Sequence, residues 1–160
     1  MRRVILCLVA ACALAALASS GAVANGGNGG SGRGVVCVLH AKLRAQNETP
    51  PTTSTAKGHT LIKVRRDGTI EYKTHISNPG HENFIAGHIH QAPAGVPGPI
   101  VVPLFGPPSL PTNARNIKQS GTATPNPGTT GQAICSNPSA YYVNYHTTQF
   151  PAGAIRGQLH

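Results

Sequence analysis

Short segments in which apolar and polar residues alternate one by one recur along most of this chain. An alternation with a period of two is typical of a β-strand that buries one face. The clearest examples are residues 39–44, 58–65, 70–76, 141–146 and 155–159. Turn-forming Gly, Pro, Asn and Asp residues separate these segments, and Asp67-Gly68 is a strong hairpin signal. The pattern therefore predicts a chain of short antiparallel strands.

Three weaker segments add to this set. Residues 84–90 predict a strand with Ile85 and Ile89 on one face, residues 100–104 another, and residues 117–124 a third. A Pro-rich loop is expected between the last two. No segment shows a convincing helical period, and the 19 Gly and 14 Pro residues disfavour helices. We therefore expect an all-β fold, an antiparallel β-sandwich with Greek-key connections and seven to eight strands.

The N-terminus has the pattern of a secretory signal peptide over residues 1–24. Arg2 and Arg3 precede an apolar run at 4–18, which is shorter than the roughly 20 residues of a membrane span. Ala22-Val23-Ala24 resembles a cleavage site, so we expect cleavage after Ala24 and a secreted, periplasmic or extracellular protein. Lipidation at Cys12 is a less favoured alternative, because it would leave a very short apolar segment. The mature chain has no other run long enough to span a membrane.

The mature chain divides into a flexible Gly-rich linker, residues 25–34, and one domain, residues 35–160. Of the chain's four cysteines, Cys37 and Cys135 remain after cleavage. In an oxidising compartment two cysteines can pair in one way within a chain, so we expect a Cys37–Cys135 disulfide. Two buried free thiols are the alternative.

Acidic residues are scarce, with four Asp and Glu against 13 Lys and Arg. No pair of carboxylates on one element suits glycoside hydrolysis, and no nucleophile elbow, P-loop or dinucleotide motif occurs. We therefore assign no catalytic residues. Cationic residues gather in the first three predicted strands and predict an anionic cell-surface polymer or another protein as partner. They include Lys42, Arg44, Lys63, Arg65 and Arg66. Aromatic residues are not interleaved with them, so nucleic acid is not expected; a merely solvated face is the alternative.

Histidines supply the one candidate metal site. His88 and His90 are two apart on a strand and share a face, while Ile89 points to the core. His146 lies on the outward face of another strand. Three neutral imidazoles suit copper or zinc, with Arg156 and Asn144 as supporting residues. Alternatively, these histidines hold the 92–99 loop by hydrogen bonds, and Arg156 anchors a loop carbonyl or Glu48.

Four phrases occur in order: LRAQNETPP at 43–51, His88-Ile89-His90 with Gly95 and Gly98, residues 141–147, and residues 150–159. Together they resemble the CHRD domain family, named for the repeats in chordin, over about residues 36–159. The resemblance implies a secreted or extracellular β-domain that serves as a scaffold or interaction module.

The His-x-His strand is also similar, more distantly, to the copper-ligand strand of copper/zinc superoxide dismutases. That resemblance implies a copper site with an arginine nearby, for which Arg156 is the candidate. No His lies between His90 and His146, so the bridging histidine and the zinc loop are missing. A two-metal site is therefore excluded.

We favour a secreted CHRD-like module with a non-enzymatic binding or structural role and no assured cofactor. The alternative is a mononuclear copper- or zinc-binding protein with a superoxide-dismutase-like site.

Overall fold

The computed structural model describes residues 34–105 and 111–160. The expected signal peptide, Cys12 and residues 25–33 of the expected linker lie outside the described residues. Among those that are described, no helix is both long and apolar enough to cross a membrane.

Eight β-strands account for most of the described chain, and each covers or closely overlaps a segment predicted from the sequence. They are β1 (Val35–Arg44), β2 (Lys57–Arg65), β3 (Ile70–Ser77), β4 (Phe84–Gln91), β5 (Ile100–Phe105), β6 (Asn116–Ala123), β7 (Tyr141–Thr147) and β8 (Ile155–Gln158). The remaining elements are the helix α1 (Gly131–Ser136) and two single 3-10 turns, η1 (Ala45–Asn47) and η2 (Pro138–Ala140).

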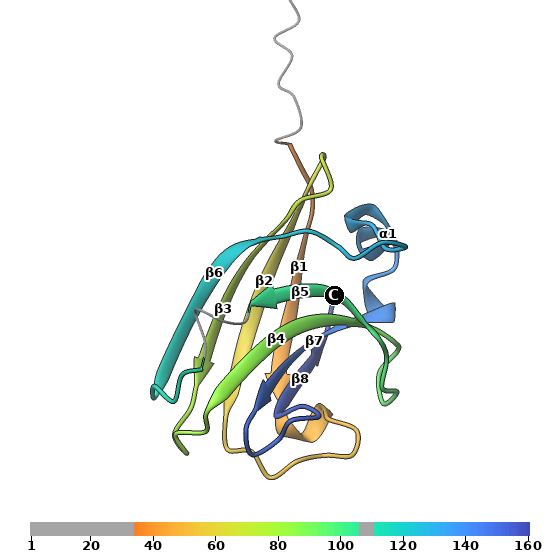
Figure 1. Ribbon diagram of the computed structural model, residues 1–160. Helices are drawn as coiled ribbons and strands as arrows, with labels where there is room; N and C mark the ends of the chain where they lie inside the picture. The colour runs from red at the N-terminus through yellow and green to blue at the C-terminus, as the bar shows by residue number, and fades with distance from the viewer. Residues whose placement is uncertain (1–33, 106–110) are drawn as a thin grey trace, which may run out of the picture.

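The strands form one antiparallel sheet in the order β5-β4-β7-β8-β1-β2-β3-β6. The sheet folds over on itself, and β4 and β5 cross in front of β1, β2 and β3 (Figure 1). The two halves meet along a narrow seam, where Arg44 of β1 pairs with Arg156 of β8. On the other side, the Asn126 amide donates to Val101 O of β5 at 2.8 Å. The sheet is therefore nearly closed, and the predicted all-β fold class is confirmed.

The inward side chains of both halves form one apolar core. Its most deeply buried members include Leu43, Ile62, Ile70, Ile76, Phe84, Ile89, Val102, Tyr145 and Ile155. The Tyr145 hydroxyl satisfies its hydrogen bonding inside this core, 2.6 Å from Thr74 Oγ1. Because inward and outward residues alternate, the remaining side chains of each half line two outer faces that point in opposite directions.

The prediction of which side chains of β4 face the core is wrong for the first residues of the strand. Ile85 was expected to share the core face with Ile89, but Phe84 is fully buried and Ile85 is partly exposed. The pairing of β4 with β7 is irregular between Phe84 and Ala86. A bulge inserts one extra residue and reverses the side on which the preceding side chains lie. Ile89 lies in the core as predicted.

The absence of helices was also predicted wrongly, because residues 131–136 form α1. The Thr130 hydroxyl accepts a hydrogen bond from the Ala133 amide and caps its start, and Ile134 is fully buried. A helix of six residues is too short to show a helical period in the sequence. Cys135 of α1 forms a disulfide with Cys37 of β1, as the sequence predicts.

Candidate metal centre

The outer face of β4, β7 and β8 is covered, although the alternation alone would leave it in solvent. Every residue of β7 is buried, on both faces of the strand. The Arg156 guanidinium donates to Pro93 O at 2.9 Å, and the Gln158 amide to Ala92 O at 2.9 Å, which holds the loop after β4 over this face. The polar side chains beneath the loop are thereby partly withdrawn from water.

Three imidazoles meet in this covered region. His88 and His90 come from β4, and His146 comes from the neighbouring strand β7, where it pairs with Ala86. Each ring can offer one nitrogen, and these nitrogens all lie within 4.8 Å of one another. In the metal-free protein, His88 Nδ1 donates a hydrogen bond to His146 Nε2 at 3.1 Å. Two nitrogens on one tetrahedral zinc ion, at bonds of about 2.0–2.1 Å, lie about 3.3 Å apart.

Backbone carbonyls orient two of the three rings. His90 Nδ1 lies 2.9 Å from Gly98 O, and His146 Nδ1 lies 3.0 Å from Pro151 O. Because a carbonyl only accepts, each Nδ1 carries the proton and each Nε2 keeps its lone pair. The Nε2 of His90 is buried and has no hydrogen-bond partner. This is the arrangement of metal-ligating histidines, whose second nitrogen is held by a carbonyl or carboxylate.

Gly98 permits the close approach that orients His90. A Cβ at this position would lie 2.1 Å from Gln91 O, so a side chain would force the loop away from β4. The Gly98 amide also donates to the Tyr142 hydroxyl at 3.1 Å. Both contacts fix the loop over the imidazoles.

Burial lowers the pKa of all three histidines, and it lowers the pKa of His88 to about 4, with smaller contributions from His146 and His90. At neutral pH the three rings are therefore uncharged. A neutral imidazole has the free lone pair that metal binding requires.

Two residues were expected to support the histidines. The first, Arg156, packs on the Tyr142 ring and not directly on an imidazole. Its guanidinium carbon lies 3.4 Å from the centroid of the Tyr142 ring. That ring stacks on His90 with centroids 4.9 Å apart and planes 9° apart. The second, Asn144, lies in the middle of β7. In the strand register it is opposite His88 of β4 on one side and opposite Arg156 of β8 on the other.

Glu48 completes the polar cluster. Glu48 is 8% exposed, and its carboxyl accepts a hydrogen bond from Asn144. Burial raises its pKa to about 7, although the charge of Arg156 and the Asn144 bond act in the opposite direction. Among the described residues, the buried side-chain polar atoms without a partner are Glu48 Oε1, His90 Nε2 and Asn144 Oδ1. Buried polar atoms without a partner are rare in folded proteins, and a bound ion or water is one explanation for three of them in one region.

Sequence reasoning missed two parts of this site. The alternation over residues 141–146 does not reveal that Tyr142 stacks on His90, and the carbonyls of Gly98 and Pro151 leave no sequence pattern. An available signal was the composition of β7, YYVNYHT, which lacks the charged residues of a solvated face.

The histidine pKa values predict an acid-sensitive fold. His88 is neutral in the folded protein down to pH of about 4 but protonates near 6.5 when unfolded, so the unfolded chain binds more protons between these values. The contribution of His88 to the stability of the metal-free protein is therefore expected to fall as pH drops from about 6.5 to 4. Glu48 has the opposite effect. Its pKa is raised to about 7 in the folded protein, so the folded state binds more protons and loses stability as pH rises toward 7.

Urea unfolding in EDTA at several pH values, with the His88→Gln variant beside the native protein, isolates the histidine effect. The difference in unfolding free energy between the two proteins should change across this window. An equal pH dependence would contradict the prediction.

The expected anion-binding cations do not join the histidine cluster. Lys42, Arg44 and Lys63 occupy outward positions on β1 and β2, in the other half of the sheet. Arg65 binds Glu71 at 2.7 Å, and the exposed Arg66 lies in the turn after β2.

These features define a class: an all-β domain with a nearly closed antiparallel sheet, one disulfide and three converging imidazoles on a covered outer face. The chain belongs to the CHRD domain family, whose family model matches residues 39–159. The match confirms the sequence resemblance and lies within the predicted domain of residues 35–160. Comparisons with curated proteins and with solved structures each found no match.

Proposed function

We propose that this CHRD domain is a secreted metal-binding module that holds one copper or zinc ion at His88, His90 and His146. The observation that carries the proposal is the convergence of three imidazole nitrogens within 4.8 Å, one of them buried without a partner. The Cys37–Cys135 disulfide supports the secreted location, because disulfides persist mainly in oxidising compartments.

The donor set favours copper or zinc over harder ions. Imidazole nitrogens suit these metals, whereas magnesium and calcium prefer oxygen ligands. Three protein ligands also leave a position for water or another small ligand. Within the described residues, this is the one group of three or more candidate ligands, which supports a single ion.

A purely structural role explains less of the geometry. It accounts for the hydrogen bonds of His90 and His146 to the loop carbonyls. It leaves His90 Nε2 buried without a partner, at a cost of about 1–3 kcal/mol for an unsatisfied polar group. A metal ion would satisfy that nitrogen, and it would replace the hydrogen bond between His88 Nδ1 and His146 Nε2 with bonds to the ion.

The proposal is tested on the full chain, stripped with EDTA and then loaded separately with Cu²⁺, Zn²⁺ and Co²⁺. After desalting, elemental analysis should find about one copper or zinc ion per chain. The copper form should show nitrogen hyperfine splitting in its electron paramagnetic resonance spectrum, and the cobalt form should show visible ligand-field bands. The proposal would be overturned if the loaded protein retained no ion, or if the spectrum of the copper form showed no nitrogen hyperfine splitting.

A further inference from the structure

The second outer face of the sandwich, formed by β1, β2, β3 and β6, carries a row of cationic and imidazole side chains. The register pairs Lys42 with His59, His59 with His75, and His75 with Lys118. These four residues, the cationic row, therefore lie side by side across four strands. With neighbouring strands about 4.8 Å apart, the row spans about 14 Å.

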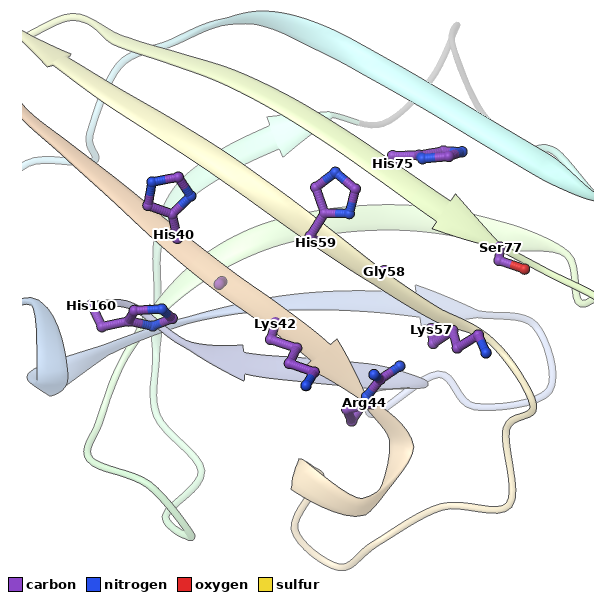
Figure 2. Close-up of a pocket in the computed structure, with 10 residues that line it drawn as sticks. His40, Lys42, Arg44, Lys57, Gly58, His59, His75, Ser77 and His160 are labelled. Carbon is purple, nitrogen blue, oxygen red and sulfur yellow. The ribbon is translucent and has the colours of Figure 1, made fainter.

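Further cations flank the cationic row on the same face. Arg44 pairs with Lys57 on one side of it, and Lys73 pairs with Leu61 on the other. Figure 2 shows Lys42, Arg44 and Lys57 at one end of this face, with His40, His59 and His75 each rising from a different strand. Of these residues, Lys42, Lys57, His59, Lys73 and Lys118 are exposed.

Few acidic side chains lie near these cations. The chain has four acidic residues. Glu48 and Glu82 are buried elsewhere, and Asp67 lies in the turn between β2 and β3. Glu71 is the one acid that faces outward here, and its carboxylate binds Arg65 at 2.7 Å. The cationic row is thus free to attract an anion.

The surface along the cationic row is hollowed rather than flat. One hollow of about 490 Å³ extends from His59 and His75 toward Lys42, Arg44, Lys57 and His160. A second, of about 480 Å³, extends from the same two histidines toward Lys73 and Lys118. The two hollows share His59 and His75 and therefore adjoin at these side chains, and we call the two hollows together the track.

We propose that this track binds a linear anionic polysaccharide, with the polymer lying across the strands along the cationic row. An extended polyanion can contact Lys42 and Lys118 at the same time, which a single small anion cannot. Its hydroxyl groups match the hydrogen-bonding capacity of His59, His75 and Ser77, which line the two hollows.

Nucleic acid fits this face less well. Tyr72 of β3 is 6% exposed and points into the core, and no other Tyr or Phe lies on β1, β2, β3 or β6. Bases would therefore find imidazole rings but no larger Tyr, Phe or Trp ring on which to stack. A lipid surface fits less well too, because the hollows lie among charged and polar groups, with Leu61 half-buried between them.

The test measures binding of the full chain to polygalacturonate at low ionic strength. The double variant Lys42→Gln/Lys118→Gln removes both ends of the cationic row and should weaken binding about tenfold. The matched control Arg66→Gln/Arg115→Gln removes the same charge from exposed positions in the turn after β2 and before β6. It should change binding less than about threefold. Added salt should weaken binding of the native protein.

Three further probes distinguish the partner. Neutral dextran, phosphatidylglycerol vesicles and single-stranded oligothymidylate should each bind more weakly than polygalacturonate. Equal losses in the two double variants would overturn the proposal, because they would show a response to net charge alone. Tighter binding to vesicles or to oligothymidylate would also overturn it. EDTA throughout keeps this test independent of the metal proposal.

Discussion

Replacing His88 and His90 together by alanine is expected to abolish stoichiometric copper or zinc binding. The variant keeps His146 alone of the three converging nitrogens. Even the outer partners of metal ligands contribute about 10–100-fold in affinity, so the loss of two ligands should exceed 100-fold. Elemental analysis after loading and a competition titration with a chromophoric chelator measure the effect.

The pair His59 and His75 offers a matched control. Its rings also lie on an outer face of the sandwich, with centroids 5.6 Å apart, but on the opposite side of the molecule. The variant His59→Ala/His75→Ala loses the same number of imidazoles and should still bind one ion. If both double variants bound as the native protein does, the metal centre would not lie at the three histidines.

Folding must be separated from ligation in this experiment. Ile89 lies between the two histidines and is fully buried, so far-ultraviolet circular dichroism and urea unfolding should accompany the titration. The volume-conserving variant His90→Gln provides a second measurement, because it removes the buried Nε2 lone pair with a smaller change in packing. It should bind the ion far more weakly while its sheet remains intact.

The second large effect concerns stability. The variant Cys37→Ser/Cys135→Ser is expected to unfold with a free energy about 2–5 kcal/mol lower than that of the native protein. The disulfide joins residues 98 positions apart, and closing a long loop restricts the unfolded chain strongly. It also ties α1 to β1 beside the core that Ile134 enters.

Thermal and urea unfolding measure this loss, and a decrease in Tm of about 10 °C is expected for a loss near 3 kcal/mol. Thr130→Ala is the control, since it removes the cap of α1 while leaving the disulfide intact. It should cost about 1 kcal/mol. A cysteine double variant no less stable than Thr130→Ala would contradict the prediction.

The strands were predictable because their chemistry is local. In β2, His59, Leu61 and Lys63 alternate with residues that the core buries, and this pattern is readable without the rest of the chain. The reversal at Phe84 was not readable, because the bulge depends on how β4 pairs with β7. The helix α1 was not readable either, because it is stabilised by the Thr130 cap, by burial of Ile134 and by the disulfide to the distant Cys37.

The candidate metal centre was only half predictable for the same reason. The spacing of His88 and His90 places both on one face of any strand. His146 lies close to His88 and His90 because β4 and β7 are neighbours in the sheet. The two strands are far apart in the sequence, so the sequence does not reveal that they are neighbours. The groups that orient the rings are the carbonyls of Gly98 and Pro151, and every residue has such a carbonyl.

The histidine site and the cationic row lie on opposite outer faces of this small domain. A molecule resting on an extracellular matrix through the Lys42 side would hold its imidazole cluster on the side turned away from that support. Anchorage and metal exchange would then not compete for the same surface. Many such copies on one polymer would form an immobilised layer of metal sites, each on the side of its domain that faces away from the polymer.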